Sequence, residues 1–432
     1  MSLLNQSTNL NKKIFKILTI LFFSFLPVSF IYGNSSINLN IILLSILLLI
    51  YCFNNNKWGW LKDDLFLSLF FLYSFLVFNS CLAHYRGFSI DYNGIDKSPD
   101  GIIRSLTFIK FILLIYAFKI LIFNYEILEK IIKVWLFIIL VFIIDIFFEA
   151  ITQKNILGYV SPDGTRIVSF FKDEMVVGGF VYCFGFAIGS FYLSKNNNTY
   201  EKFFFSIFLT LIPLTVFITG ERSNFIKSSL LFLLLITFIN RYRLFFNKKI
   251  IISCLILVIS LFFTFNIKAN TTYTEFFKRI YLANKNDKLD QKFKTIKYYA
   301  HFDTAIKIFK NYPLLGVGNK NFRIECRKDK YFDQKVLFSK HRCSTHPHQV
   351  HFEILAEHGL IGYCIILFIL IRFIIKNIYL YRIKRDFFDL NSIFYLSLFF
   401  IPLLPGSGIF SSFNGAYFWI IFSLLNLQFV KK

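Results

Sequence analysis

The chain has 432 residues, of which 56% are hydrophobic and only 17% are charged, and its formal net charge is +23. Soluble domains carry about 25% charged residues, so a soluble monomer could not bury this much apolar surface. The Lys and Arg residues are spread over short segments between apolar runs. This distribution is typical of membrane topology signals and argues against a nucleic-acid-binding protein.

Twelve apolar runs reach or approach the roughly 20 residues that a helix needs to cross a bilayer. The expected spans are 14–33, 38–53, 65–83, 103–124, 132–151, 174–194, 203–219, 223–240, 249–267, 353–376, 390–406 and 409–429. The first run has no small-residue cleavage site, so we expect a retained span and not a signal peptide. The sequence therefore predicts an all-α integral membrane protein with about 12 transmembrane helices.

Basic residues between the spans predict the orientation. Groups of Lys and Arg at 12–13, 57–62, 195–202, 241–249, 372–385 and 431–432 fall on one side, which the positive-inside rule assigns to the cytoplasm. Both termini are then cytoplasmic in a bacterial inner membrane. The chain divides into a transmembrane bundle at 1–267 with nine spans, a large periplasmic loop with short helices at 268–352, and three further spans at 353–432.

The large loop is the part of the chain with the most polar sequence. Apolar residues recur at helical spacing up to Tyr312-Pro313, where a helix should end, and a glycine-rich turn follows. Cys326 and Cys343 lie 17 positions apart. In an oxidising compartment they could form a disulfide worth about 3 kcal/mol, and the alternative is two unpaired thiols.

Six of the seven histidines fall in or beside this loop: His301, His341, His346, His348, His351 and His358. The run Ser344 to Gln349 is typical of a helix start, and we expect His348 in the first turn. A helix N-terminus keeps such a His neutral and able to accept a proton, and its free N–H groups favour phosphate.

Two other interpretations of this histidine remain open. His348 could be a surface imidazole that caps the helix. Alternatively, His346, His348 and His351 could bind a metal with Glu353 or Glu357, although their spacing differs from the usual two-histidine zinc motif.

Two arginines lie at the membrane surface on the periplasmic side. Arg166 precedes the sixth span, and Arg222 lies where the seventh span turns into the eighth. Because a guanidinium close to hydrocarbon is costly without a partner and binds diphosphate oxygens with fork geometry, both are candidates for binding a lipid diphosphate. The alternatives are snorkelling to the interface or, for Arg222, a local pair with Glu221.

Two segments of the chain, NYPLLGVG at 311–318 and THPHQVHFEILAEHGLIG at 345–362, resemble the signature of the O-antigen ligase and O-antigen polymerase superfamily. In that family a PLxGxG turn precedes an HNxxLxxLxExGLxG helix. The resemblance implies that His348 is the catalytic histidine and that Arg166 and Arg222 bind the diphosphate. Gln349 stands where the family has Asn.

One further family arginine has no counterpart, because Lys297 and Tyr298 stand at its usual place. Its role would fall to Arg279 or Arg323. Glu357 and His346 are further supporting candidates.

The resemblance also implies a function. The protein would be a GT-C-like membrane glycosyltransferase that needs no metal or other cofactor. Its partners would be membrane lipids, and it would bind no nucleic acid. An acceptor hydroxyl would attack the anomeric carbon of an undecaprenyl-diphosphate-linked glycan, with inversion. The expected reaction joins an O-antigen or related glycan to lipid A-core in lipopolysaccharide biosynthesis.

Two other functions remain open. A polymerase would join lipid-linked repeat units to one another, and a flippase would move the lipid-linked glycan across the membrane. A flippase should have charged residues along a central path, and few occur within the expected spans: Lys110, Lys119, Asp145 and Lys227.

Overall fold

A computed structural model describes the chain except for residues 1, 90–99, 163, 165, 173, 196–197, 241–296, 337, 403, 407 and 428–432. The described residues form helices and loops, with no strand among them. The expected span at 249–267 and the candidate Arg279 lie outside the described residues.

The long apolar helices account for most of the expected spans. Eight helical stretches of the described chain are long and apolar enough to cross a membrane. They lie in α1 (Ser2–Ile31), α2 (Asn34–Asn55), α3 (Asp64–Tyr85), α4 with α5 (Asp100–Thr107 and Ile109–Leu121), α6 (Tyr125–Thr152), α7 (Val177–Lys195), α8 (Thr199–Ile218) and α15 (Val350–Lys384). The prediction of an all-α integral membrane protein is confirmed. The helix α9 (Arg222–Asn240) covers the expected span at 223–240.

The last two helices are shorter than we expected. The helix α16 (Phe387–Phe399) and the helix α17 (Asn414–Leu425) are separated by residues 400–413, here called the 400–413 loop. The expected helix ends at 406 and 409 were therefore wrong. Pro402 and Pro405 lack a backbone N–H, and Gly406 and Gly408 have low helix propensity, so this stretch does not continue either helix.

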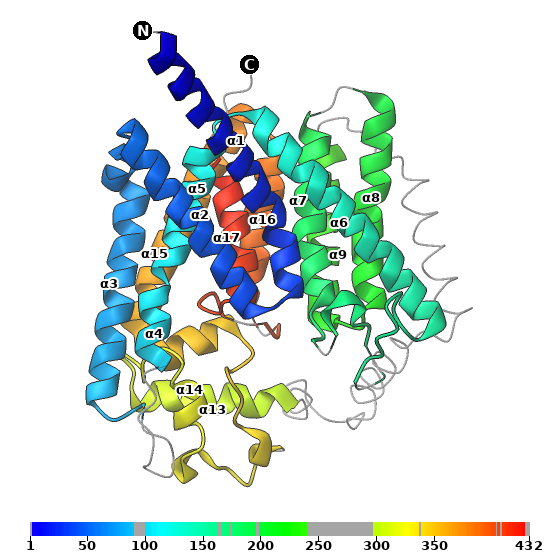
Figure 1. Ribbon diagram of the computed structural model, residues 1–432. Coiled ribbons are helices and arrows are strands. Elements are labelled where there is room, and N and C mark those ends of the chain that lie inside the picture. The colour runs from blue at the N-terminus through cyan, green and yellow to red at the C-terminus, as the bar shows by residue number, and fades with distance from the viewer. Residues whose placement is uncertain are drawn as a thin grey trace.

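Both chain ends lie at one end of the bundle. The first turns of α1 and the last turn of α17 are at the top of Figure 1, and residues 297–349 are at the bottom. The 400–413 loop lies between the bundle and that lower unit (Figure 1). The apolar core of the bundle draws residues from α1 and α2 through to α17, including Phe30, Trp135 and Trp419.

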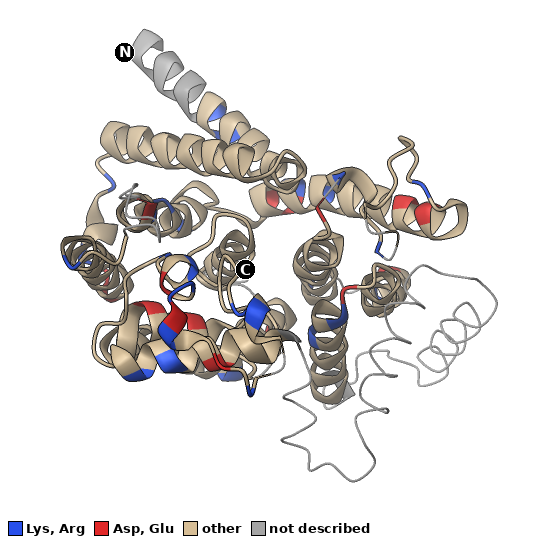
Figure 2. Cartoon of the chain, turned by 90° about the horizontal axis from the view of Figure 1, so that it is seen from below, with Lys and Arg blue, Asp and Glu red and all other residues tan. Residues whose placement is uncertain are grey.

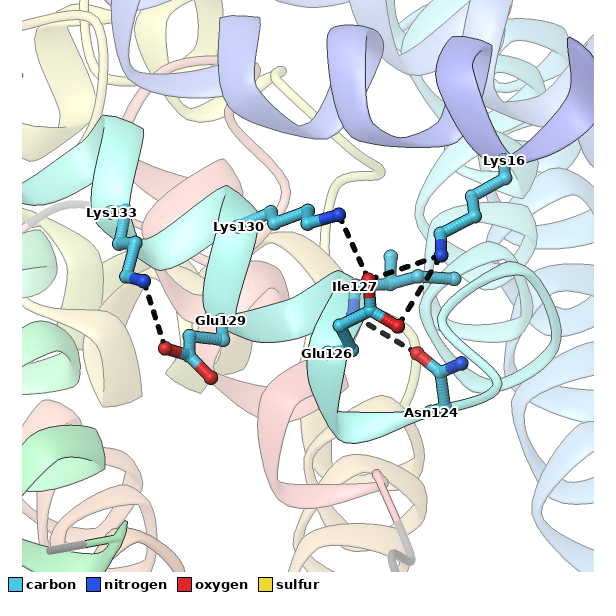
Figure 3. A network of polar contacts seen from close by, with 7 residues as sticks. All are labelled: Lys16, Asn124, Glu126, Ile127, Glu129, Lys130 and Lys133. Carbon is cyan, nitrogen blue, oxygen red and sulfur yellow. Dashed lines mark hydrogen bonds and ion pairs between the residues drawn. The ribbon is translucent and has the colours of Figure 1, made fainter. Parts of the chain in front are cut away.

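Lysines and glutamates form ion pairs where α1 meets α6 (Figure 3), and Lys195 of α7 also takes part. Glu126 pairs with Lys16 at 3.2 Å and with Lys130 at 2.8 Å, and Glu129 pairs with Lys133 at 3.0 Å and with Lys195 at 2.6 Å. Exposed pairs of this kind contribute little stability, on the order of 0 to 1 kcal/mol each. These ion pairs therefore indicate a lysine-rich surface on the bundle and add little to its stability.

Residues 297–349 form a small unit with its own core. It contains α13 (Lys297–Asn311), α14 (Phe322–Glu325) and two short turns, η3 (Asp329–Tyr331) and η4 (Ser339–His341). Phe322, Cys326 and Tyr331 are fully or almost fully buried and pack with Ala83 of α3 and Ala356 of α15. Lys, Arg, Asp and Glu residues gather over this unit, as Figure 2 shows from below, whereas most of the bundle carries neither charge.

Candidate functional site

A kink in α15 explains the glycine-rich turn that precedes it. Gly359 lies inside the helix with φ 63° and ψ −167°. The kink leaves two carbonyl groups before Gly359 without helical partners, and the turn supplies donors for both. The N–H of Val317 donates to the Ala356 carbonyl at 3.0 Å, and the N–H of Gly318 donates to the Glu357 carbonyl at 2.7 Å.

The same turn also accepts hydrogen bonds from the far side of the kink. The N–H of Leu360 donates to the Pro313 carbonyl at 2.8 Å, and the N–H of Ile361 donates to the Leu314 carbonyl at 3.2 Å. Buried backbone groups need such partners. The two segments that carry the family resemblance are therefore one structural unit, in which the turn completes a broken helix.

Two glycines allow the turn to come this close. Gly316 has φ 64°, and a Cβ atom there would overlap the backbone of Glu357. Gly318 has φ 87°, and a Cβ atom there would overlap the side chain of Ala83 on α3. Since other residues rarely adopt a left-handed conformation, glycine meets both requirements. The turn thereby joins α15 to α3.

His348 lies just before α15, not in its first turn as we expected. Gln349 caps the helix by accepting the N–H of Phe352 at 3.0 Å, so the helix begins at Val350. His348 itself has φ 59°, a left-handed conformation. Its carbonyl accepts the N–H of Gly406 at 2.7 Å. The 400–413 loop therefore holds the backbone of His348 outside the helix.

The imidazole of His348 lies in a cluster of rings. Its ring centroid is 4.3 Å from that of His346, 5.1 Å from that of Tyr298 and 5.2 Å from that of His301. Its Nε2 atom lies 3.0 Å from the Ser344 hydroxyl. A neutral imidazole can accept a hydrogen bond at Nε2, and an acceptor hydroxyl that takes the place of Ser344 would meet a base there.

The neighbouring histidines differ in what they can do. His301 is buried, and its Nδ1 lies 3.0 Å from the Arg342 carbonyl, so this nitrogen donates its proton there. Burial, together with the charges of Lys320 and His301, lowers the pKa of His346 to about 4. His346 is therefore neutral near pH 7 and adds no positive charge beside His348.

Glu353 and Glu357 are buried on the first turns of α15. Lys320 pairs with Glu353 at 3.5 Å, and the N–H of Phe322 donates to Glu357 at 3.3 Å. A Cβ atom at Gly408 would overlap the carboxylate of Glu353. The two glutamates thus tie the lower unit and the 400–413 loop to α15. These contacts give Glu357 a structural position beside the site.

The segments that carry the two candidate arginines are joined directly. The N–H of Ile167, next to Arg166, donates to the carbonyl of Thr219 at 3.2 Å. Thr219 lies three residues before Arg222, which begins α9. The structure therefore brings together the two segments that carry Arg166 and Arg222.

Glu221, between these arginine segments, occupies the N-terminus of α7. Its carboxylate accepts the N–H groups of Gly178 and Gly179, the latter at 3.2 Å, and the side-chain amide of Asn224 at 2.6 Å. Burial raises the pKa of Glu221, and the hydrogen bonds and the charge of Arg166 oppose that rise. Since Glu221 fills this helix terminus, a phosphate group would have to bind at the arginine side chains instead.

Two other sequence candidates lie elsewhere. Arg323 pairs with Asp100 at the start of α4. Cys326 and Cys343 are joined by a disulfide, with Cα atoms 5.4 Å apart, which connects α14 to the segment before Ser344. It therefore fixes the segment whose next residue, Ser344, contacts His348.

The metal alternative has little support in the geometry. His351 uses both ring nitrogens, with Nε2 2.8 Å from the Phe400 carbonyl and Nδ1 3.0 Å from the Tyr363 hydroxyl. In the described part of the chain, no three His, Cys, Asp or Glu side chains gather as metal ligands would.

Sequence reasoning missed several residues around His348. Tyr298, His301 and Ser344 surround its ring. The sequence gives no sign of this, because the residues come from a helix and from a separate disulfide-linked segment that meet only in the fold. Lys227 was noted only as a charge within a span. The sequence did contain a signal for a functional role of Lys227, because it is a lysine in an apolar helix and lies five residues after Arg222.

The fold and this site define a class: a multi-pass membrane protein with a polar unit at one end of its helix bundle, where a histidine lies beside a loop from the bundle. Residues 205–367 match the family model described as O-antigen ligase. This match confirms the resemblance to the O-antigen ligase superfamily that the two motifs predicted, and it covers both motifs. A search of curated proteins found no match. The chain is therefore a membrane enzyme of the O-antigen ligase and polymerase type.

Proposed function

We propose that this protein transfers a glycan from undecaprenyl diphosphate to lipid A-core, at the periplasmic face of the inner membrane, as a step in lipopolysaccharide biosynthesis. The family domain at 205–367 supports this class of reaction. Two observations support the proposed orientation: the basic residues predicted to be cytoplasmic, and the shared end of the two chain termini (Figure 1). The lower unit at 297–349 then faces the periplasm, where both lipid-linked substrates would meet.

In the proposed step, an acceptor sugar hydroxyl attacks the anomeric carbon of the donor glycan. The hydroxyl proton passes to Nε2 of His348, and a new glycosidic bond forms as the bond from carbon to diphosphate oxygen breaks. Undecaprenyl diphosphate leaves with the electron pair, and the configuration inverts. The charge that develops on this leaving group would be stabilised by Arg166 and Arg222, which keep their positive charge at all relevant pH values.

The observation that carries the proposal is how firmly His348 is held. Its backbone is fixed by Gly406, its ring nitrogen meets a hydroxyl at 3.0 Å, and its histidine neighbour His346 is neutral. A base that is already in place costs little reorganisation in the reaction. Surface capping alone would not require the left-handed backbone at this position.

The test uses purified full-length protein, a lipid-linked glycan donor and two alternative acceptors. Transfer to lipid A-core, with little joining of donor units, would support ligation. Joining of donor units without transfer to lipid A-core would instead support a polymerase, which uses the same donor chemistry with a different acceptor. Movement of lipid-linked glycan across vesicles with no transfer to either acceptor would contradict both and support a flippase.

A further inference from the structure

Lys227 is one of two buried lysines among the described residues, with 6% of its surface exposed. Its ammonium lies over the ring of Phe399, 5.4 Å from the centroid. No carboxylate or hydrogen-bonding oxygen in the described part of the chain pairs with it. The other buried lysine, Lys110, donates to Asn38 at 2.6 Å and to Ser412 at 3.1 Å. Among the described residues, Lys227 thus lacks the carboxylate partner that a buried charge normally has.

The position of Lys227 on α9 places it near the arginines. It follows Arg222 by five residues, which corresponds to about 7.5 Å along a helix. Helical side chains tilt toward the helix N-terminus, and a lysine stem is long and flexible. A lysine at this position can therefore extend toward the end of α9 that carries Arg222.

Lys227 is also close to the segment that holds His348. A Cβ atom on Gly406 would lie 3.1 Å from the Lys227 ammonium nitrogen. The N–H of Gly406 donates to the His348 carbonyl at 2.7 Å. Lys227 is thus joined through the backbone of α9 to Arg222 and through the 400–413 loop to His348. These connections link it to both parts of the candidate site.

We propose that Lys227 binds the diphosphate of the lipid-linked donor, as a third cation beside Arg166 and Arg222. This inference rests on the proposed function. The anomeric carbon must lie between the base that receives the acceptor proton and the diphosphate that leaves. A cation next to the His348 segment, on the side of the arginines, is where the charge on the leaving oxygen develops. The diphosphate would supply an anionic partner, which the described residues do not provide.

The experiment measures how full-length variants bind undecaprenyl diphosphate and undecaprenyl monophosphate. The variant K227M keeps the apolar stem and removes the charge, and K227R restores a cation. The control K119M removes a lysine of α5 that pairs with Asp63. Because hydrogen bonds to charged groups are the stronger kind, we expect K227M to weaken diphosphate binding about 10- to 100-fold. Monophosphate binding should weaken less.

We expect K227R to bind within a few-fold of the unmodified protein and K119M to bind unchanged. Two results would overturn the inference: K227M binds the diphosphate as tightly as the unmodified protein, or K227M loses thermal stability and K227R fails to restore binding, which indicates a purely structural lysine. If the unmodified protein binds no diphosphate, the proposed function fails as well. If only K227M is unaffected, the proposed function stands and the inference alone fails.

Discussion

At the scale of single residues, the site depends on keeping imidazoles neutral. His348 lies among Tyr298, His301 and His346, and a second positive charge in this cluster would oppose proton transfer to His348. Burial meets this requirement at His346, whose pKa falls to about 4. The nearby charge of Lys320 contributes to the same shift.

The low pKa of His346 predicts a dependence of stability on pH. The unfolded chain binds a proton at this residue below about pH 6.5, whereas the folded chain does so only near its lowered pKa, so acid favours unfolding. Stability should be fully present above pH 6.5 and should fall as the pH drops toward 4. Between pH 7 and pH 5, we expect the free energy of unfolding of the variant H346Q to fall by about 1 to 2 kcal/mol less than that of the unmodified protein.

Thermal midpoints in detergent at both pH values measure this difference. The control T345A removes only the hydroxyl that lies 3.0 Å from His346 Nδ1. Equal acid sensitivity of H346Q and the unmodified protein would show that His346 does not titrate in this window.

At the scale of elements, the kinked α15 and the glycine-rich turn form the scaffold of the site. The sequence predicted the end of α13 near Tyr312, the turn and the helix that carries His348, because proline, glycine and apolar spacing are local signals. It did not predict that Gly359 breaks this helix or that His348 lies before it. Both depend on partners far along the chain, namely the turn at 313–318 and Gly406.

The kink predicts that Gly359 tolerates no side chain. In G359A, the new Cβ atom would overlap the backbone of Leu314, and the residue would have to keep φ 63°. Left-handed strain alone costs about 1 to 3 kcal/mol, and the overlap adds to it. We expect a clear loss of thermal stability and of transfer activity.

Two matched variants separate these effects. G33A imposes a positive φ of 80° with nothing near the new atom, and G59A adds a methyl group in open space. G33A should show the strain alone, and G59A should change stability by less than about 0.5 kcal/mol. A G359A protein as stable as G59A would contradict the kinked arrangement.

At the scale of the whole molecule, the sequence predicted most of the bundle and only part of the site. The length of an apolar run and the basic residues beside it can be read directly from the sequence. Eight expected spans therefore coincide with long apolar helices. The two arginine segments were predicted from the sequence, but their junction was not. It depends on the bond from Ile167 to Thr219, between segments about 50 residues apart, which no local pattern encodes.

The orientation of the molecule predicts the state of Cys326 and Cys343. If the unit at 297–349 is periplasmic, these residues are oxidised in cells and react with a thiol reagent only after reduction. Labelling of the same protein after reduction and denaturation provides the reference. Reduction should lower stability by about 3 kcal/mol in the chain-entropy model. Full labelling of both cysteines without reductant would contradict the periplasmic placement.

The central claim is that His348 accepts the proton of the acceptor hydroxyl, and the most direct measurement is the rate of glycan transfer by purified H348A. The control is H341A, which removes an exposed histidine of the same unit. We expect transfer by H348A to fall at least about 100-fold, with donor binding and thermal stability retained, because general base catalysis typically contributes that much or more. H341A should remain close to the unmodified protein. A folded H348A that retains more than about a tenth of the transfer rate would contradict the claim.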